Sequence, residues 1–103
     1  MRFGFCLPHD GELSLPRNIV ALAQHAEKLG FDTLVEPSDH LIMPNTIRTV
    51  YPYSTSGEYT DTTEDLDQAT TLAFLASKTS KIRLMTGISV VPYRNPIALA
   101  NAY

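Results

Sequence analysis

Cysteine and tryptophan are almost missing from this chain of 103 residues, which has one cysteine, Cys6, and no tryptophan. A single cysteine can form neither a disulfide within the chain nor a metal site built from several cysteines. This composition agrees with a protein of the reducing cytosol, and we expect a cytoplasmic location. We expect Cys6 itself to be a small buried hydrophobic residue.

Long apolar runs and an excess of positive charge are also lacking. No stretch approaches the roughly 20 apolar residues that a membrane helix needs, and the start of the chain lacks the apolar run of a secretory signal. Lysine and arginine together number 8, against 11 for aspartate and glutamate. The scattered basic residues offer no positive surface to a phosphate backbone. We therefore expect neither a membrane nor a nucleic acid as a partner.

Several motifs that carry chemistry in other proteins are absent. The sequence contains no glycine-rich phosphate loop of the usual dinucleotide or nucleotide type, and no serine nucleophile elbow. A zinc site needs three or four ligands, and His9, Asp39 and His40 resemble one only weakly because no cysteine lies near them. We expect no metal.

The first 36 residues have the pattern of a strand, a helix and a second strand. Residues 1–7 are largely apolar and predict a buried strand, and the β-prone residues 33–36 predict another. Between them Ser14 and Pro16 suit the first turn of a helix, and Gly30 suits its end. Apolar residues at helical spacing fall on one face of this helix: Leu15, Ile19, Leu22, Ala26 and Leu29.

The remaining chain continues the alternation of helix and strand. Residues 37–65 have no period, and we expect an ordered, site-forming loop, with a disordered insertion as the alternative. A strand is predicted for residues 82–91, where the internal Gly87 indicates a bulge or a close backbone approach. Asn95-Pro96 has the order of an N-cap followed by a first helical residue. Residues 66–80 predict a helix with this stripe: Ala69, Leu72, Ala73 and Ala76.

Strand and helix alternation favours an α/β protein with parallel strands in the order 1-2-3. A complete (β/α)₈ barrel usually needs roughly 250 residues. We expect residues 1–103 to be one partial TIM-barrel domain, namely the first three βα units of an incomplete barrel with an unfinished last helix. Two open sheet edges would then need covering, so a homo-oligomer is expected.

Reacting groups of parallel α/β barrels lie on the loops that follow the strands. Ser38-Asp39-His40 follows the second predicted strand. Histidine titrates near neutral pH, so His40 is the candidate acid or base. The alternative is a loop histidine that is exposed or hydrogen-bonded for structural reasons. His9 and Asp10, after the first strand, fit a surface turn better than a site.

Taken together, six segments resemble the N-terminal portion of the luciferase-like monooxygenase superfamily, and most closely its branch that uses the deazaflavin coenzyme F-420. The resemblance covers essentially the whole chain in the right order. The segments are Leu29-Gly30-Phe31-Asp32, Ser38-Asp39-His40-Leu41, Tyr51-Pro52-Tyr53, Thr71-Leu72-Ala73-Phe74-Leu75-Ala76, Ile82-Arg83-Leu84 and Pro92-Tyr93-Arg94-Asn95-Pro96.

The resemblance implies which residues serve the cofactor. His40 corresponds to the catalytic histidine beside the flavin or deazaflavin ring, and Asp39 to its acidic neighbour. Thr86, Gly87 and Ile88 correspond to a bulge that backs the ring, where the family has a cis peptide bond, here Gly87-Ile88. The chain departs from the family in lacking a strand-two tryptophan and in reading Met-Thr-Gly where Gly-Thr-Ser is more common.

The activity implied is hydride transfer between coenzyme F-420 and a small organic substrate. An FMN-dependent monooxygenase of the same fold is the first alternative, because both kinds of enzyme use the same face of the barrel. A second alternative is a truncated, non-catalytic chain that persists through oligomerisation. The choice between the two cofactors depends on a phosphate site that this segment does not contain.

Overall fold

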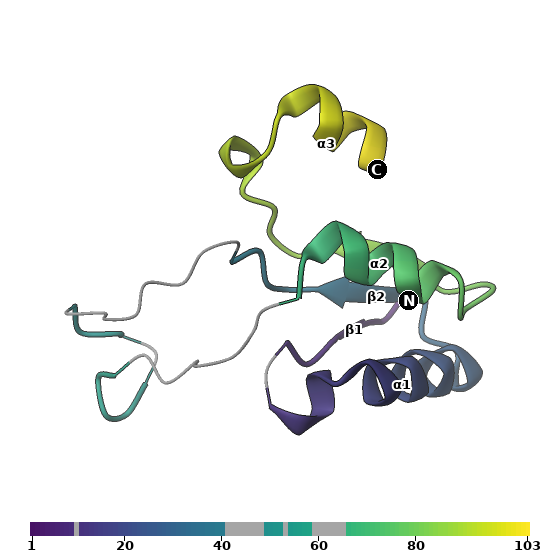
Figure 1. Ribbon diagram of the computed structural model, residues 1–103. Coiled ribbons are helices and arrows are strands. Elements are labelled where there is room, and N and C mark those ends of the chain that lie inside the picture. Colours follow the sequence, from purple (N-terminus) through teal and green to yellow (C-terminus); the bar gives the residue numbers. More distant parts are fainter. Residues whose placement is uncertain (10, 41–48, 53, 59–65) are drawn as a thin grey trace.

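The computed structural model describes residues 1–9, 11–40, 49–52, 54–58 and 66–103 (Figure 1). None of the helices in these ranges is long and apolar enough to cross a membrane. Short 3₁₀ turns, η1 and η2, cover Glu12–Ser14 and Val91–Tyr93. The regular elements are β1 (Gly4–Cys6), α1 (Pro16–Leu29), β2 (Thr33–Glu36), α2 (Gln68–Ala76), β3 (Arg83–Thr86) and α3 (Pro96–Ala102).

The three strands form one parallel sheet in the order β1-β2-β3, so the predicted α/β class and strand order are confirmed. Phe5, Leu34 and Leu84 lie opposite one another in register. Because side chains alternate along a strand, these three share one face of the sheet. That face carries the core, since Leu34 belongs to the buried cluster that also includes residues of α1 and α2, and Phe5 and Leu84 pack against this cluster.

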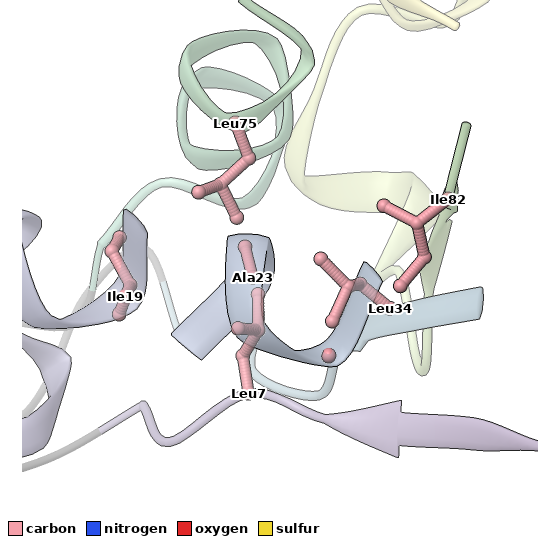
Figure 2. Packing of buried hydrophobic residues seen from close by; sticks show 7 residues of the cluster. Leu7, Ile19, Ala23, Leu34, Leu75 and Ile82 are labelled. Atoms are coloured by element: carbon pink, nitrogen blue, oxygen red, sulfur yellow. The ribbon is translucent and has the colours of Figure 1, made fainter. Parts of the chain in front are cut away.

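The core lies between that face of the sheet and the two helices. Figure 2 shows Ala23 of α1 between Ile19, on the same helix, and Leu34 of β2, with Leu75 of α2 beside Ala23. Ile19 and Leu34 are among the largest fully buried side chains in the described structure. The complete buried cluster is Leu7, Ile19, Ala23, Ala26, Leu34, Leu75 and Ile82.

Helix α1 begins and ends where the sequence predicts. Pro16 is its first residue, where a missing N–H costs nothing, and Gly30 follows its last turn with a left-handed φ of 85°. Its buried residues are Ile19, Ala23 and Ala26. The predicted apolar face is therefore correct at its centre and wrong at its ends, because Leu15, just before the helix, and Leu29, its last residue, are exposed.

Helix α2 is shorter than the predicted 66–80 and presents a different face. The Asp67 side chain accepts a hydrogen bond from the backbone N–H of Thr70, which sets the helix start. The predicted stripe is wrong except at Leu72, because polar residues of α2 point inward. The buried residues are Gln68, Thr71, Leu72 and Leu75.

The expected buried strand over residues 1–7 is too long, and its burial is correct only for Leu7 and in part for Phe5. The strand has three residues, and Gly4 and Cys6 are exposed. Cys6 is correspondingly an exposed free thiol rather than a buried hydrophobic residue. The physical reason is that Gly4 and Cys6 lie on the face of the sheet opposite the one on which the helices pack.

The predicted strand 82–91 is also too long. β3 ends at Thr86, and η2 follows after a short connection. The start of α3 is confirmed, since the Asn95 side chain accepts hydrogen bonds from the backbone N–H groups of Ile97 and Ala98. No residue of α3 is buried.

Only part of the long connection between β2 and α2 belongs to the described structure. Residues 49–52 and 54–58 bring Tyr51 and Gly57 together, with a backbone hydrogen bond of 2.8 Å from Tyr51 N to Gly57 O. The expectation of an ordered loop also concerns residues 41–48, 53 and 59–65, which lie outside the described residues.

Candidate active site

The ends of β2 and β3 lie side by side at the carboxyl edge of the sheet. The backbone N–H of Gly87 donates to the carbonyl of Glu36 at 2.7 Å. The fully buried Gln68 donates through Nε2 to the carbonyl of Glu36 at 3.0 Å and to that of Ile88 at 2.8 Å. One buried amide therefore holds both strand ends in place.

Gly87 is the point of closest approach between these segments. A Cβ atom placed there would lie 2.9 Å from Val35 Cγ1, 3.2 Å from Pro37 Cα and 3.3 Å from Glu36 O. Two of these three atoms are backbone and cannot easily move away. The sequence predicted a bulge or a close approach at this glycine, and the close approach is confirmed.

The peptide bond between Gly87 and Ile88 is trans, and no cis peptide bond occurs in the described parts of the chain. The expected cis bond is therefore wrong for this structure. A trans bond is lower in free energy by about 3–4 kcal/mol between residues other than proline. The hydrogen bond from Gly87 N–H to the Glu36 carbonyl is made with the trans geometry.

His40 is exposed at the end of the turn that follows β2. Its Nδ1 atom lies 3.2 Å from the hydroxyl oxygen of Ser38, which is itself buried. The backbone N–H of Ser38 donates to the buried carboxylate of Glu36 at 3.4 Å. Ser38 thus contacts Glu36 through its backbone N–H and His40 through its hydroxyl, so the exposed imidazole has a buried neighbour at Nδ1.

Asp39 points the other way, into the protein. Its side chain is only 1% exposed and lies against Arg94, with Oδ1 2.7 Å and Oδ2 3.0 Å from Nη1. Oδ1 makes no hydrogen bond of good geometry, so its contact with the guanidinium is an ion pair only. Oδ2 also accepts from the backbone N–H of Val90 at 2.5 Å and from the Ser89 hydroxyl at 3.4 Å.

Arg94 extends this ion pair to a second carboxylate. Its Nη2 atom lies 2.8 Å from Asp67 Oδ2. The hydrogen bond from Arg94 lowers the pKa of Asp67, and the two carboxylates raise the pKa of Arg94. Arg94 thus connects the turn after β2, the start of α2 and the segment that leads into α3.

The other residues expected to serve a cofactor lie at the end of β3. Thr86 is half-buried and shares by alternation the face of Leu84, on which the helices pack. Ile88 is 68% exposed. Hydrogen bonds from Gly87 to Glu36 and from Val90 to Asp39 hold this segment next to the turn that bears His40.

Three residues of this region were missed as site residues by sequence reasoning, namely Glu36, Gln68 and Arg94. Glu36 was assigned only as a strand residue, and Gln68 lay outside the predicted apolar stripe. Arg94 belonged to one of the six segments of the resemblance but had no role. The sequence signal that could have identified these three residues is their position at the end of a predicted strand or next to the start of a predicted helix.

His9 follows β1 and is half-buried, while Asp10 lies outside the described residues. Among the described residues, no three His, Cys, Asp or Glu side chains gather closely enough to hold a metal ion. The arrangement at the strand ends consists instead of an exposed imidazole, an exposed apolar side chain and a buried polar network behind them.

A parallel α/β sheet with these groups at its carboxyl edge defines an α/β protein with a strand-end site. The family model described as luciferase-like monooxygenase matches residues 1–103, so the chain belongs to this family. Members are flavin-dependent oxidoreductases and monooxygenases, and the family uses flavin or deazaflavin cofactors. Comparison with curated proteins and with solved structures finds no match.

Proposed function

We propose that this chain supplies the catalytic edge of a deazaflavin-dependent oxidoreductase that transfers hydride between coenzyme F-420 and a small organic substrate. The observation that carries this proposal is the placement of His40 and Ile88. Both side chains are exposed, and their segments are joined through Asp39 and Val90 at the carboxyl edge of a parallel sheet. Family membership supplies the class of chemistry.

The residues present fit a flat heteroaromatic ring. Ile88, 68% exposed, offers apolar surface for a ring face. His40 offers a polar, titratable edge on the neighbouring turn. Ring-binding sites commonly combine apolar walls with a few placed polar groups. Of the other residues expected to bind the cofactor, Thr86 and Gly87 would support the ring from the strand end, and Asp39 would act from behind His40.

A flavin or deazaflavin supplies hydride transfer when it is bound. The chain's own contribution is to hold or move a proton at the imidazole of His40. We propose that this exchange takes place at Nε2, because Nδ1 lies in contact with the Ser38 hydroxyl. A positioned histidine of this kind contributes about 10²–10⁴-fold to the rate.

The architecture in which this site works is proposed to be a (β/α)₈ barrel. The three parallel strands with helices on one face support an assignment of residues 1–103 as the first three βα units of one such domain. The bare face of the sheet would then line the interior of the barrel. The remaining units would complete the cofactor site.

The test is His40→Asn in the intact protein, with His25→Asn as the matched control. His25 is an exposed histidine on α1, away from the strand ends. We expect turnover to fall about 10²–10⁴-fold for His40→Asn and to stay unchanged for His25→Asn. Equal turnover in both variants would contradict the assignment of His40.

Titration of the purified protein with coenzyme F-420 and with FMN, followed by absorbance, tests the cofactor. Tighter binding of the deazaflavin supports the proposal. Tighter binding of FMN would replace it with an FMN-dependent monooxygenase on the same site. Binding of neither, together with no turnover, would favour the non-catalytic alternative.

A further inference from the structure

Arg94 occupies the junction of three segments that are distant in the sequence. Arg94 lies in the sequence between η2 and α3, and its side chain is 15% exposed. Nη1 contacts the carboxylate of Asp39, which is 55 residues away, and Nη2 contacts that of Asp67, 27 residues away. Each of the two terminal nitrogens of the guanidinium is therefore paired with a carboxylate.

Asp39 depends on this arginine. The Asp39 side chain is 1% exposed, and the guanidinium of Arg94 forms an ion pair with it. A buried carboxylate that loses its cation must either move to water or change its protonation state. Removal of the guanidinium would consequently disturb Asp39, either by moving its carboxylate toward water or by protonating it in place.

Any movement of Asp39 reaches both halves of the proposed site. His40 is the next residue in the chain, so its backbone follows that of Asp39. On the other side, Asp39 Oδ2 accepts from the N–H of Val90 and from the hydroxyl of Ser89, directly after Ile88. The same carboxylate thus links the backbone that bears His40 to the segment that follows β3.

We infer that Arg94 is a positioning residue of the proposed reaction, which acts through Asp39 to hold His40 at a fixed distance from the Gly87-Ile88 segment. The inference rests on the proposed function and deepens it. Arg94 has no assigned contact with the reacting atoms. Its role is geometric, and misplacement of a reacting group by about 1 Å can cost 10²-fold in rate.

Arginine is the side chain that suits this role. Its planar group presents separate nitrogens to two carboxylates, whereas lysine presents a single ammonium centre. The distances of 2.7 Å to Asp39 and 2.8 Å to Asp67 are made by different nitrogens of one guanidinium. A lysine at this position would keep the charge and lose one of the two contacts.

The test uses Arg94→Gln and Arg94→Lys in the intact protein, with Arg83→Gln as the control. Arg83 is exposed at the start of β3, the opposite end of that strand from the site. Two quantities are measured besides turnover: the Kd of the cofactor, and the NMR chemical shifts of the His40 ring in cofactor-free protein at fixed pH. The ring signals are assigned by their loss in His40→Asn.

For Arg94→Gln we expect kcat to fall about 10- to 100-fold while the cofactor Kd changes much less. The His40 signals should shift in Arg94→Gln and stay in place in Arg83→Gln. Arg94→Lys should recover only part of kcat. If Arg94→Gln keeps the kcat and the His40 signals of the parent, the inference is overturned.

Asp67→Asn tests the contact with Arg94 separately from the capping of α2. Asparagine still accepts from Thr70 N–H as an N-cap but loses the ion pair with Arg94. We expect a smaller loss of kcat than for Arg94→Gln, because the contact with Asp39 remains. A loss in Asp67→Asn equal to that in Arg94→Gln would show that the pair with Asp39 has no special part, against the inference.

If Arg94→Gln fails to fold, the double variant Arg94→Gln/Asp39→Asn removes the unpaired buried charge and keeps the test available. Its kcat should remain low, and a parental kcat would overturn the inference. The two proposals fail separately. Parental turnover in His40→Asn contradicts the proposed function, whereas an essential His40 with a harmless Arg94→Gln contradicts only the role of Arg94.

Discussion

The carboxylate of Glu27 on α1 accepts a hydrogen bond of 2.9 Å from the backbone N–H of Ile82, 55 residues further along the chain. The same oxygen, Oε1, accepts from the N–H groups of Ser80 at 2.8 Å and Lys81 at 2.5 Å. These bonds lower the pKa of Glu27, with that from Ile82 the largest cause. One side chain thus ties α1 to the turn that leads into β3.

Glu27→Gln should destabilise the protein in a pH-dependent way. A carboxyl whose pKa is lowered on folding stabilises fully above its ordinary value of 4.5, and this contribution is lost as the pH falls through the lowered value. Melting temperatures of parent and variant should therefore differ most above that pH and converge below it. Glu12→Gln, at an exposed position in η1, is the control. A gap that is constant with pH would contradict the prediction.

Gly87→Ala should destabilise by about 1–3 kcal/mol, the usual range for overpacking. The added Cβ would meet Val35 Cγ1 at 2.9 Å and backbone atoms of Glu36 and Pro37. Gly4→Ala in β1 is the matched control, because its nearest contact would be an ordinary 3.6 Å to Thr33 O. Chemical denaturation of both variants measures the difference. Equal stabilities would show that the strand ends separate without cost.

Gln68→Glu should introduce a carboxyl group that the folded protein accommodates only in its protonated form. Gln68 donates to two carbonyl oxygens in a fully buried place, and an ionised carboxylate there has no proton to donate. Burial and the facing oxygens raise the pKa of the introduced group. The variant should match its parent best below the ordinary glutamate pKa of about 4.3 and lose stability as the pH rises through the raised value.

Melting curves at several pH values measure this effect. Gln24→Glu is the control, since Gln24 also donates to a backbone carbonyl, that of Lys78 at 3.0 Å, but is exposed. Its melting temperature should depend much less on pH. A Gln68→Glu variant as stable as the parent at neutral pH would mean that the strand ends do not need this donor.

Local sequence signals were sufficient for much of the fold. β2 lies at the predicted residues 33–36, and Pro16, Gly30 and Asn95 mark helix ends as expected. Such signals depend on the backbone needs of neighbouring residues, and these are the same in most folds. The parallel order followed because a strand, a helix and a strand join most simply as a βαβ unit.

The inward face of α2 could not be predicted from hydropathy. An apolar stripe assumes that buried residues are hydrophobic, yet Gln68 and Thr71 are buried. Gln68 is stable there because its amide meets the carbonyls of Glu36 and Ile88. Those acceptors belong to strand ends 32 and 20 residues away, which no local pattern connects.

The candidate site was predicted only in part, because sequence position after a strand was the signal used. Asp39 and His40 were found because they follow a strand, where functional loops lie in parallel sheets. The partner of Asp39 is Arg94, 55 residues later, and their pairing depends on the three-dimensional path of the chain. The sequence pattern therefore identified Asp39 as a site residue but did not identify Arg94, the cation that holds its carboxylate inside the protein.

The face of the sheet opposite the helices carries an exposed apolar row. Cys6, Val35 and Met85 lie opposite one another in register, and Cys6 and Met85 are exposed. The outer edges of β1 and β3 make no pairing with another strand of the described structure. Unpaired edges and bare apolar surface both favour association.

We therefore predict that the 103-residue chain, produced alone, self-associates, and that Met85→Lys weakens the association. Met85 is 50% exposed on the apolar row, where a lysine would place a charge against any partner surface. Leu13→Lys is the control, because Leu13 is 58% exposed in η1, away from the sheet. Size-exclusion chromatography with light scattering gives the masses at several concentrations. We expect the parent and Leu13→Lys to exceed the monomer mass of 11.4 kDa, and Met85→Lys to move toward it. A parent that is a compact monomer with a cooperative melt would show that the open face is stable in water.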